Sequence, residues 1–178
     1  MKMVNLTIDG IQVQVPQGKT ILQAAQSIGI DIPTLCYDPR LRPDGACRMC
    51  VVEVEKARTL VCSCSTPAAE GMVVHTESPR VVEARKEIIR LLWANHPYNC
   101  LTCEKAGNCK LQDYSYRYDI TDEDIQSFEG ARREIPVDET NEFYTYDPSK
   151  CILCGKCVRV CSQLSVVDAI GKSGRGFA

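Results

Sequence analysis

The sequence has no long apolar stretch, no strong excess of charge of either sign and no disorder-like composition. No run of about 18 apolar residues is present, so no segment is predicted to span a membrane. The opening MKMVNLTIDG lacks the apolar core, roughly 7–15 residues long, of a secretory signal. The formal net charge of −2 provides no general attraction to nucleic acid or anionic lipid. We therefore expect a soluble cytoplasmic protein, or one on the cytoplasmic face of a membrane complex.

What the sequence does contain is a large number of cysteines. At 178 residues, with 44% hydrophobic and 25% charged residues, it is typical of a globular protein of one domain or two to three small ones. Twelve cysteines in a secreted protein would indicate disulfides. In an intracellular protein thiols stay reduced, so metal ligation is the better interpretation.

The first 78 residues are predicted to form a small mixed β-sheet packed on one helix. Alternating apolar residues flank the turn Asp9-Gly10, which predicts a β-hairpin. Thr20 is a candidate N-cap for a short helix over residues 21–28. Further strands are expected over residues 51–55, 59–64 and 72–76.

The clearest helix is predicted over residues 79–95. Ser78 is suited to its N-cap and Pro79 to its first turn. Apolar residues are spaced to share one face of this helix: Val81, Ala84, Ile88, Leu91 and Leu92. Residues 113–147 are acidic, tyrosine-rich and weakly periodic, so we expect a connecting segment there with at most one short helix.

The last cysteine cluster has the most specific spacing. Cys151-x2-Cys154-x2-Cys157-x3-Cys161 matches the bacterial ferredoxin run for a [4Fe–4S] cluster, apart from the proline usual after the fourth cysteine. Structural zinc sites use two separated pairs of ligands instead. Gly155 would allow backbone N–H groups to approach cluster sulfur closely. The run therefore predicts an iron–sulfur cluster.

The first cysteine cluster is Cys36-x10-Cys47-x2-Cys50, followed by Cys62 and Cys64. Plant-type [2Fe–2S] ferredoxins also combine one cysteine, a close pair and a distant fourth, with a shorter first loop. Cys62 and Cys64 would face the same side of a strand, so strand parity leaves the fourth ligand open. The other one would be a small buried hydrophobe.

The middle cluster combines one histidine with three cysteines, as His96-x3-Cys100-x2-Cys103-x5-Cys109. On its own this set could be a zinc site, and His96 could instead be a helix-end histidine that touches the last carbonyls. The other histidine, His75, has no cysteines at ligand-like spacing beside it, and we expect it to be structural.

Four ordered stretches give the chain a family resemblance. They are CYDPRLRPDGACRMC, SCSTPAAEGMVV, HPYNCLTCEKAGNCKLQD and CILCGKCVRVC. Together they resemble the N-terminal iron–sulfur region of the complex I large iron–sulfur subunit. The same region resembles those of [FeFe]-hydrogenases, the diaphorase part of NAD-reducing hydrogenases and NAD-linked formate dehydrogenases. The resemblance covers essentially the whole chain.

The resemblance implies one [2Fe–2S] and two [4Fe–4S] clusters. The implied ligands are Cys36, Cys47, Cys50 and Cys64 for the first cluster and His96, Cys100, Cys103 and Cys109 for the second. For the third cluster the ferredoxin-like spacing gives Cys151, Cys154, Cys157 and Cys161. Cys64 is favoured over Cys62 because it lies in the S-C-x-x-P part of the family pattern, Ser63 to Pro67. In the family the fourth cysteine of the last run often serves a different cluster, whereas all four cysteines would hold one cluster if the chain is a short subunit.

The fold class implied is α+β. We expect an N-terminal β-grasp [2Fe–2S] ferredoxin-like domain over residues 1–78 and a small helical [4Fe–4S] domain with one histidine and three cysteine ligands over 79–120. A connecting segment over 121–146 would lead to a bacterial-ferredoxin-like [4Fe–4S] segment, half of a two-cluster module, over 147–178. Because relatives usually continue past this point, the chain is either a short subunit or a piece of a longer polypeptide.

The function implied is electron transfer. The chain has neither a phosphate-binding glycine loop nor a flavin motif, so we expect no substrate active site in it. The expected partners are a flavin- and NAD(P)H-binding iron–sulfur subunit and a catalytic or second acceptor subunit, with ferredoxin as one candidate, in a complex that could also be electron-bifurcating. The alternatives are the cluster region of a longer catalytic subunit ([FeFe]-hydrogenase or formate dehydrogenase), a zinc-binding structural or regulatory protein, and a thiol redox protein that uses its C-x-x-C pairs.

Overall fold

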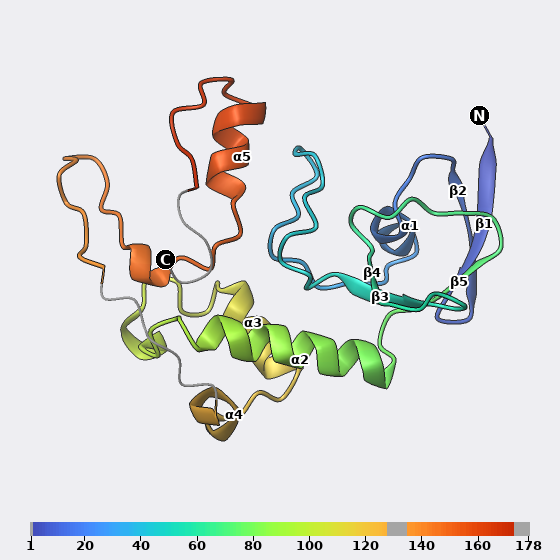
Figure 1. Cartoon of the computed structure of the whole chain (residues 1–178), viewed down its shortest axis with the longest axis horizontal. Helices are drawn as coiled ribbons and strands as arrows, with labels where there is room; N and C mark the ends of the chain where they lie inside the picture. The colour runs from blue at the N-terminus through green and yellow to red at the C-terminus, as the bar shows by residue number, and fades with distance from the viewer. Residues whose placement is uncertain (1, 128–134, 173–178) are drawn as a thin grey trace.

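A computed structural model describes residues 2–127 and 135–172, which form a mixed sheet, a helical middle part and a C-terminal helix (Figure 1). The strands are β1 (Met3–Ile8), β2 (Ile11–Pro16), β3 (Val51–Val54), β4 (Val61–Cys62) and β5 (Met72–His75). The α-helices are α1 (Ile21–Ser27), α2 (Pro79–Trp93), α3 (Lys110–Arg117), α4 (Asp122–Ser127) and α5 (Lys156–Gln163). Short 3-10 helices span Cys100–Thr102 and Pro148–Lys150. None of the helices in this described part is long and apolar enough to cross a membrane.

The five strands form one mixed sheet in the order β2-β1-β5-β3-β4. The predicted hairpin is confirmed: β1 and β2 pair antiparallel, and both Asp9 and Gly10 in the turn have positive φ, at 47° and 82°. Such a turn suits the right-handed twist of a two-stranded ribbon. β1 pairs parallel with β5, which makes the sheet mixed as expected.

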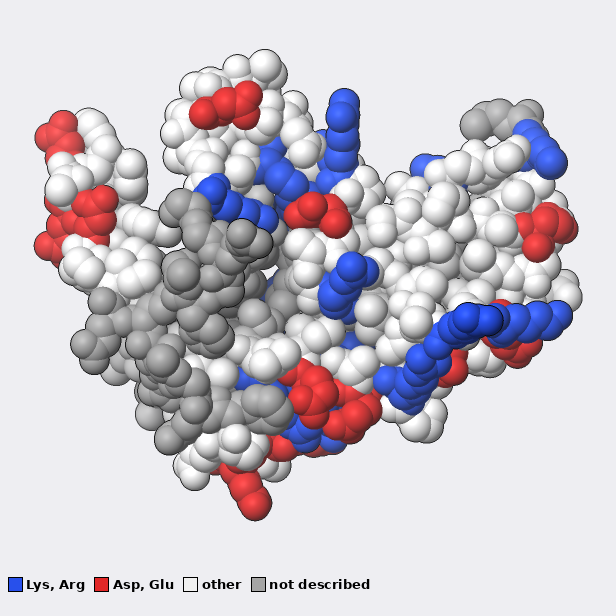
Figure 2. Space-filling view, in the orientation of Figure 1, with Lys and Arg blue, Asp and Glu red and all other residues white. Residues whose placement is uncertain are grey.

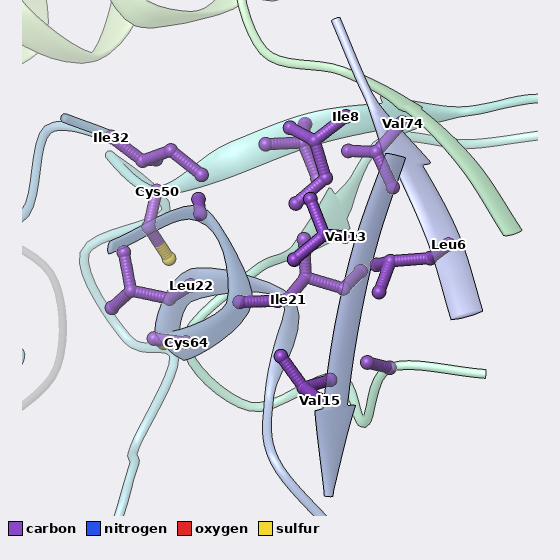
Figure 3. Close-up of a cluster of buried hydrophobic side chains, with 14 of the residues drawn as sticks. Leu6, Ile8, Val13, Val15, Ile21, Leu22, Ile32, Cys50, Cys64 and Val74 are labelled. Atoms are coloured by element: carbon purple, nitrogen blue, oxygen red, sulfur yellow. The ribbon is translucent and has the colours of Figure 1, made fainter. Parts of the chain in front are cut away.

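Helix α1 covers one face of this sheet. Thr20 caps it as predicted, through a capping box in which Thr20 Oγ1 accepts from the Gln23 N–H and Gln23 Oε1 accepts from the Thr20 N–H. Ile21 and Leu22 are fully buried against the strands. Figure 3 draws this core, in which the cysteines Cys50 and Cys64 lie among the apolar side chains near α1.

The predicted strand over residues 59–64 is wrong in length. The chain pairs with β3 only at Val61 and Cys62. From Ser63 the backbone turns, and the N–H groups of Ser65 and Thr66 both bond to the Cys62 carbonyl, 3.2 and 3.0 Å away. This turn moves Cys64 out of the strand, so strand parity does not govern its direction.

Helix α2 begins as predicted and ends two residues early, at Trp93 rather than residue 95. Ser78 caps it through the Val81 N–H, with Pro79 in the first turn. Its predicted apolar face is partly wrong, because Leu91 is 56% exposed. The residues that it buries are Val81, Arg85, Ile89 and Trp93. The buried stripe therefore includes an arginine, whose partners are described below.

The expectation of at most one short helix over residues 113–147 is also wrong. Helix α3 runs through Arg117, and α4 follows at Asp122. α4 is fixed by a reciprocal cap, in which the Thr121 N–H donates to Asp124 Oδ2 and the Asp124 N–H to Thr121 Oγ1. Arg90 of α2 adds an ion pair to Asp124 at 2.7 Å.

A second apolar core joins these helices to the cysteine-bearing loops. It is built from Leu35, Met49, Ile89, Trp93, Leu111, Tyr118 and Ile125, with Cys47, Cys100 and Cys109 packed against it. Thiols from the first and the middle cysteine clusters therefore lie against one core. On the face drawn in Figure 2, basic and acidic groups are interspersed among uncharged surface.

Candidate functional site

Thiols of the first cysteine cluster gather in one buried place. Cys36, Cys50 and Cys64 are 1%, 1% and 0% exposed, and the Cys36 N–H lies 3.4 Å from Cys47 Sγ. A hydrogen bond from the Cys36 thiol lowers the pKa of Cys47 to about 6 and raises that of Cys36. The Cys64 thiol lies close to those of Cys36 and Cys47 and is hydrogen-bonded to Cys50, which lowers its pKa and raises that of Cys50.

This donor set fits a group that carries positive charge. In each of the two thiol pairs the pKa of one thiol is lowered and that of the other is raised, because two adjacent thiolates would repel each other. Iron binds cysteine as thiolate and would supply the positive charge that lets all of these sulfurs be deprotonated together. The residues present are therefore chemically suited to an iron–sulfur cluster.

Cys62 lies beside this group but has a partner of its own. Arg48 Nη1 is 2.8 Å from Cys62 Sγ, and the thiol is 4% exposed. Arg48 adopts a left-handed backbone conformation, φ 58°, in the short loop between Cys47 and Cys50. Burial raises the pKa of Cys62. Of the two candidates for fourth ligand, Cys64 is the one close to all three other thiols.

The four predicted residues of the middle cluster line one cavity. His96, Cys100, Cys103 and Cys109 all border it. His96 follows the end of α2 and its N–H bonds to the carbonyls of that helix's last turn, whereas Cys109 is the N-cap of α3. The chain thus places the histidine and the three cysteines around one cavity, from two helix ends and the 3-10 turn at Cys100–Thr102.

The side chain of His96 is held in one orientation. Its Nδ1 lies 3.0 Å from the Pro97 carbonyl oxygen, which can only accept, so in the neutral ring with the proton on Nδ1 the Nε2 atom is free to bind a metal. Trp93 packs edge-on against the ring, with centroids 5.4 Å apart. Burial lowers the pKa of His96, which favours the neutral imidazole that binds metals.

The last cysteine cluster is more open than the other two. Cys151 and Cys157 are exposed, and in the described residues no thiol–thiol hydrogen bond joins the four cysteines of this run. Cys157 and Cys161 lie one helical turn apart in α5, whose N-cap is Gly155 at φ 66°. Backbone N–H groups already reach two of the sulfurs: Leu153 donates to Cys151 at 3.4 Å and Ala169 to Cys161 at 3.2 Å.

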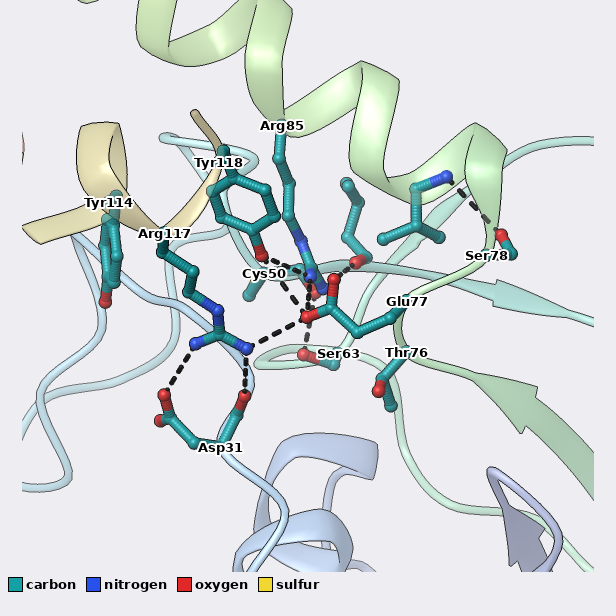
Figure 4. Close-up of polar contacts among 12 residues, drawn as sticks. Asp31, Cys50, Ser63, Thr76, Glu77, Ser78, Arg85, Tyr114, Arg117 and Tyr118 are labelled. Atoms are coloured by element: carbon teal, nitrogen blue, oxygen red, sulfur yellow. Dashed lines mark hydrogen bonds and ion pairs between the residues drawn. The ribbon is translucent and has the colours of Figure 1, made fainter. Parts of the chain in front are cut away.

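Sequence reasoning missed the buried arginine that joins the first and middle sites (Figure 4). Arg85 is fully buried, and its guanidinium donates to Glu77 Oε1, the Tyr118 hydroxyl and the Val51 carbonyl, each at 2.8 Å. Val51 directly follows Cys50, and Tyr118 follows α3. Arg117 extends the network from Glu77 to Asp31. The one available signal was Arg85 itself, four residues after Val81 on the inward face of the helix.

Three family models match consecutive parts of the chain. A 2Fe-2S iron-sulfur cluster binding domain matches residues 1–79, an NADH-ubiquinone oxidoreductase-G iron-sulfur binding region matches residues 85–124, and a 4Fe-4S binding domain matches residues 144–170. Each of these matches contains one of the three cysteine clusters. They support iron–sulfur binding in each part.

Curated relatives cover the chain almost completely. The NADH-ubiquinone oxidoreductase 75 kDa subunit of Reclinomonas americana is 38% identical over 174 residues, 98% of this chain and 25% of that protein. NADP-reducing hydrogenase subunit HndD of Solidesulfovibrio fructosivorans is 38% identical over 185 residues, 99% of this chain and 31% of that protein. The chain thus spans between a quarter and a third of the length of these two relatives.

A solved structure has the same fold. A chain in the crystal structure of an NAD+-reducing [NiFe]-hydrogenase in the H2-reduced state superposes with a TM-score of 0.87 at 33% identity. The match covers 98% of this chain and 72% of that one.

Proposed function

The chain belongs to the iron–sulfur family shared by the large iron–sulfur subunit of complex I and the NAD(P)-linked hydrogenases, and from this premise we propose that it is an electron relay. Three iron–sulfur clusters would pass single electrons between a flavin–NAD(P)H subunit and another redox centre. The observation that carries this proposal is the set of thiols at Cys36, Cys47, Cys50 and Cys64, of which Cys47 is half-buried and the other three are buried. Cys36, Cys47 and Cys50 lie in the loop between α1 and β3 and Cys64 in the turn after β4, and their thiols come close together.

The proposed ligand sets follow the three clusters of the sequence. Cys36, Cys47, Cys50 and Cys64 would hold a [2Fe–2S] cluster, and His96, Cys100, Cys103 and Cys109 a [4Fe–4S] cluster. Cys151, Cys154, Cys157 and Cys161 would hold a second [4Fe–4S] cluster. Once bound, the clusters supply one-electron oxidation and reduction. The role of the chain is to hold the thiolates, orient the imidazole and limit contact with water.

We assign each cluster to its own structural unit. Residues 1–78 would be a β-grasp ferredoxin-like domain, and residues 79–120 a helical domain that uses His96. Residues 121–146 would connect these to a half ferredoxin module over 147–178. Residues 128–134 and 173–178 of the last two units lie outside the described residues.

The proposed partners are the two ends of the relay. One is a flavin- and NAD(P)H-binding iron–sulfur subunit, and the other a catalytic or second acceptor subunit. The relatives are subunits of NADH- and NADP-linked enzymes, which supports a place in a multisubunit oxidoreductase. We place that complex in the cytoplasm or on the cytoplasmic face of a membrane.

A second candidate is the cluster-binding region of a longer catalytic subunit. It is favoured by the limited share of each relative that the chain spans. An intact mass above 19.8 kDa plus bound iron and sulfide, measured on the protein from its native source, would support this candidate. A native mass equal to that of this chain with its clusters would support the short subunit.

Metal analysis after anaerobic purification tests the relay proposal. One two-iron and two four-iron clusters predict about ten irons and about ten acid-labile sulfides per chain. Zinc without iron or sulfide would replace the relay with a structural zinc protein. Reactive thiols without any metal would indicate a thiol redox protein. About two or six irons would mean that one or both four-iron sites had been assigned wrongly.

A further inference from the structure

Helix α5 has two faces with different tasks. Cys157 and Cys161 lie four residues apart and share one face, whereas Arg159 is two residues from each and lies on the opposite face. The guanidinium of Arg159 reaches across to the first site. It donates to the Cys36 carbonyl and, at 2.9 Å, to the Arg42 carbonyl. The helix therefore stands between two cysteines of the third site, Cys157 and Cys161, and the loop of the first site.

The loop that receives Arg159 is unusually long. Cys36 and Cys47 are separated by ten residues, whereas plant-type ferredoxins have four between the corresponding cysteines. The longer loop makes two further contacts with α5. The Arg42 N–H donates to Gln163 Oε1 at 2.9 Å, and Asp44 Oδ2 lies 4.0 Å from Arg159 Nε. The longer loop thus provides the surface against which α5 packs.

Arg159 is well placed to fix this contact. Its side chain is 11% exposed, and the carboxylate of Asp44 offsets its charge. The planar guanidinium holds two carbonyls at once, so it fixes the direction of α5 as well as its distance. The first and third sites also border a common cavity of about 400 Å³, which is lined by Cys47 and Cys151.

We propose that Arg159 is the positioning residue that sets the spacing between the first and third cluster sites. The inference rests on the proposed function and adds a residue to it. The spacer is one α-helix, with a diameter of about 10–12 Å. Without Arg159 the helix would keep its cysteines but would no longer be held in one position against the Cys36–Cys47 loop. Both clusters would then form, at a variable distance from each other.

The test compares the electron spin relaxation of the reduced [2Fe–2S] cluster in variants of the full chain. A nearby paramagnetic [4Fe–4S] cluster speeds this relaxation, so the rate reports the spacing. The Cys154→Ser/Cys157→Ser double variant, which lacks the third cluster, provides the slow reference. We expect Arg159→Met to keep the wild-type iron content and to lose most of the increase in relaxation rate that the third cluster causes in the wild type. Arg159→Lys should restore part of it, because an ammonium group can hold one carbonyl.

The matched control is Arg40→Met, in the same loop. Arg40 is 69% exposed and pairs with Asp38 inside the loop, so its variant should relax as the wild type does. If Arg159→Met loses iron, Gln163→Leu removes a second contact of α5 with the loop and should itself lose part of the enhancement.

Three outcomes would overturn the inference. One is a fully loaded Arg159→Met that relaxes as the wild type, and another is a Gln163→Leu variant with no change where Arg159→Met loses iron. The third is a wild-type rate equal to that of the slow reference. Each of these leaves the relay itself standing, whereas a wild-type chain without clusters would refute the relay.

Discussion

Arg48 Nη1 lies 2.8 Å from Cys62 Sγ, which gives the spare thiol beside the first site a cationic partner. Cys64 has no hydrogen bond to a cationic side chain within the described residues and lies close to the thiols of Cys36, Cys47 and Cys50 instead. The two cysteines lie two residues apart and are nearly equally buried, so their difference is one of direction. It arises because the strand ends at Cys62 and the backbone turns before Cys64.

Cys64→Ala should therefore abolish the [2Fe–2S] cluster, whereas Cys62→Ala should keep it. The expected loss in Cys64→Ala is about two of about ten irons, together with the [2Fe–2S] circular dichroism in the visible range. Iron content and dichroism of the two variants, purified side by side, check this. The reverse result would make Cys62 the ligand. Loss of the cluster in both variants would mean that Cys62 is also needed, as a ligand or for folding of the site.

Changing His96 to cysteine should keep the middle cluster and lower its reduction potential. A neutral imidazole is replaced by an anionic thiolate, which disfavours the added electron; the shift should be on the order of 100 mV. Potentiometric titration monitored by EPR measures it. His75→Cys is the matched control, because the ring of His75 is 43% exposed and pairs with Glu55 away from the cysteines, so the potential of the middle cluster should not change in this variant. An unchanged or raised potential in the His96 variant would argue against ligation by His96.

In the buried network, Glu77→Ala should destabilise the fold more than Arg85→Met. Removing Glu77 leaves a fully buried guanidinium without its carboxylate, for which about 3–5 kcal/mol is expected. Removing Arg85 leaves Glu77, which is 43% exposed and can be hydrated, so the cost should be about 2–3 kcal/mol, mostly from hydrogen bonds and packing. Tyr118→Phe should cost only about 1 kcal/mol.

Denaturant midpoints from far-ultraviolet circular dichroism, measured on iron-loaded protein without oxygen, give the order of these three variants. Equal midpoints for Glu77→Ala and Arg85→Met would mean that Arg117 or water compensates for the missing carboxylate. The guanidinium of Arg85 would then not be an uncompensated buried charge in Glu77→Ala.

Thr121→Ala should loosen α4 without disturbing the rest of the chain. The hydroxyl of Thr121 accepts the Asp124 N–H, and loss of such a cap costs about 1 kcal/mol, roughly a fivefold change in local opening. Hydrogen exchange of the α4 amides measures it. Ser127→Ala, at the other end of α4, is the control and should leave the exchange rates close to those of the wild type. Equal rates in Thr121→Ala would mean that the Arg90–Asp124 ion pair and the packing of Ile125 hold α4 without the cap.

Local signals in the sequence predicted the local elements well. The hairpin at Asp9-Gly10 and the caps at Thr20 and Ser78 depend on neighbouring residues only, and the structure confirms all three. α4 carried an equally local signal, Thr121 followed three residues later by Asp124, which the acidic and weakly periodic composition obscured. Attention to caps rather than periodicity would have found it.

What could not be predicted depends on contacts between distant segments. The parallel pairing of β1 with β5, the burial of Arg85 and the seat of Arg159 at Cys36 each join residues that are far apart in sequence. The candidate ligands could be predicted because metal binding imposes a spacing on the residues in the sequence. The reason for the long Cys36–Cys47 loop could not be predicted, because the residues that this loop contacts lie more than 100 residues downstream.

Three separate one-electron centres in a single chain are the core of the proposed relay. EPR spin quantitation on the anaerobically purified, fully reduced protein tests this most directly. We predict about three unpaired spins per chain with about ten irons, of which one spin relaxes slowly enough to be seen at higher temperature, as a [2Fe–2S] signal. A reduced protein with bound metal but no reversible EPR signal would contradict the relay, whatever its fold.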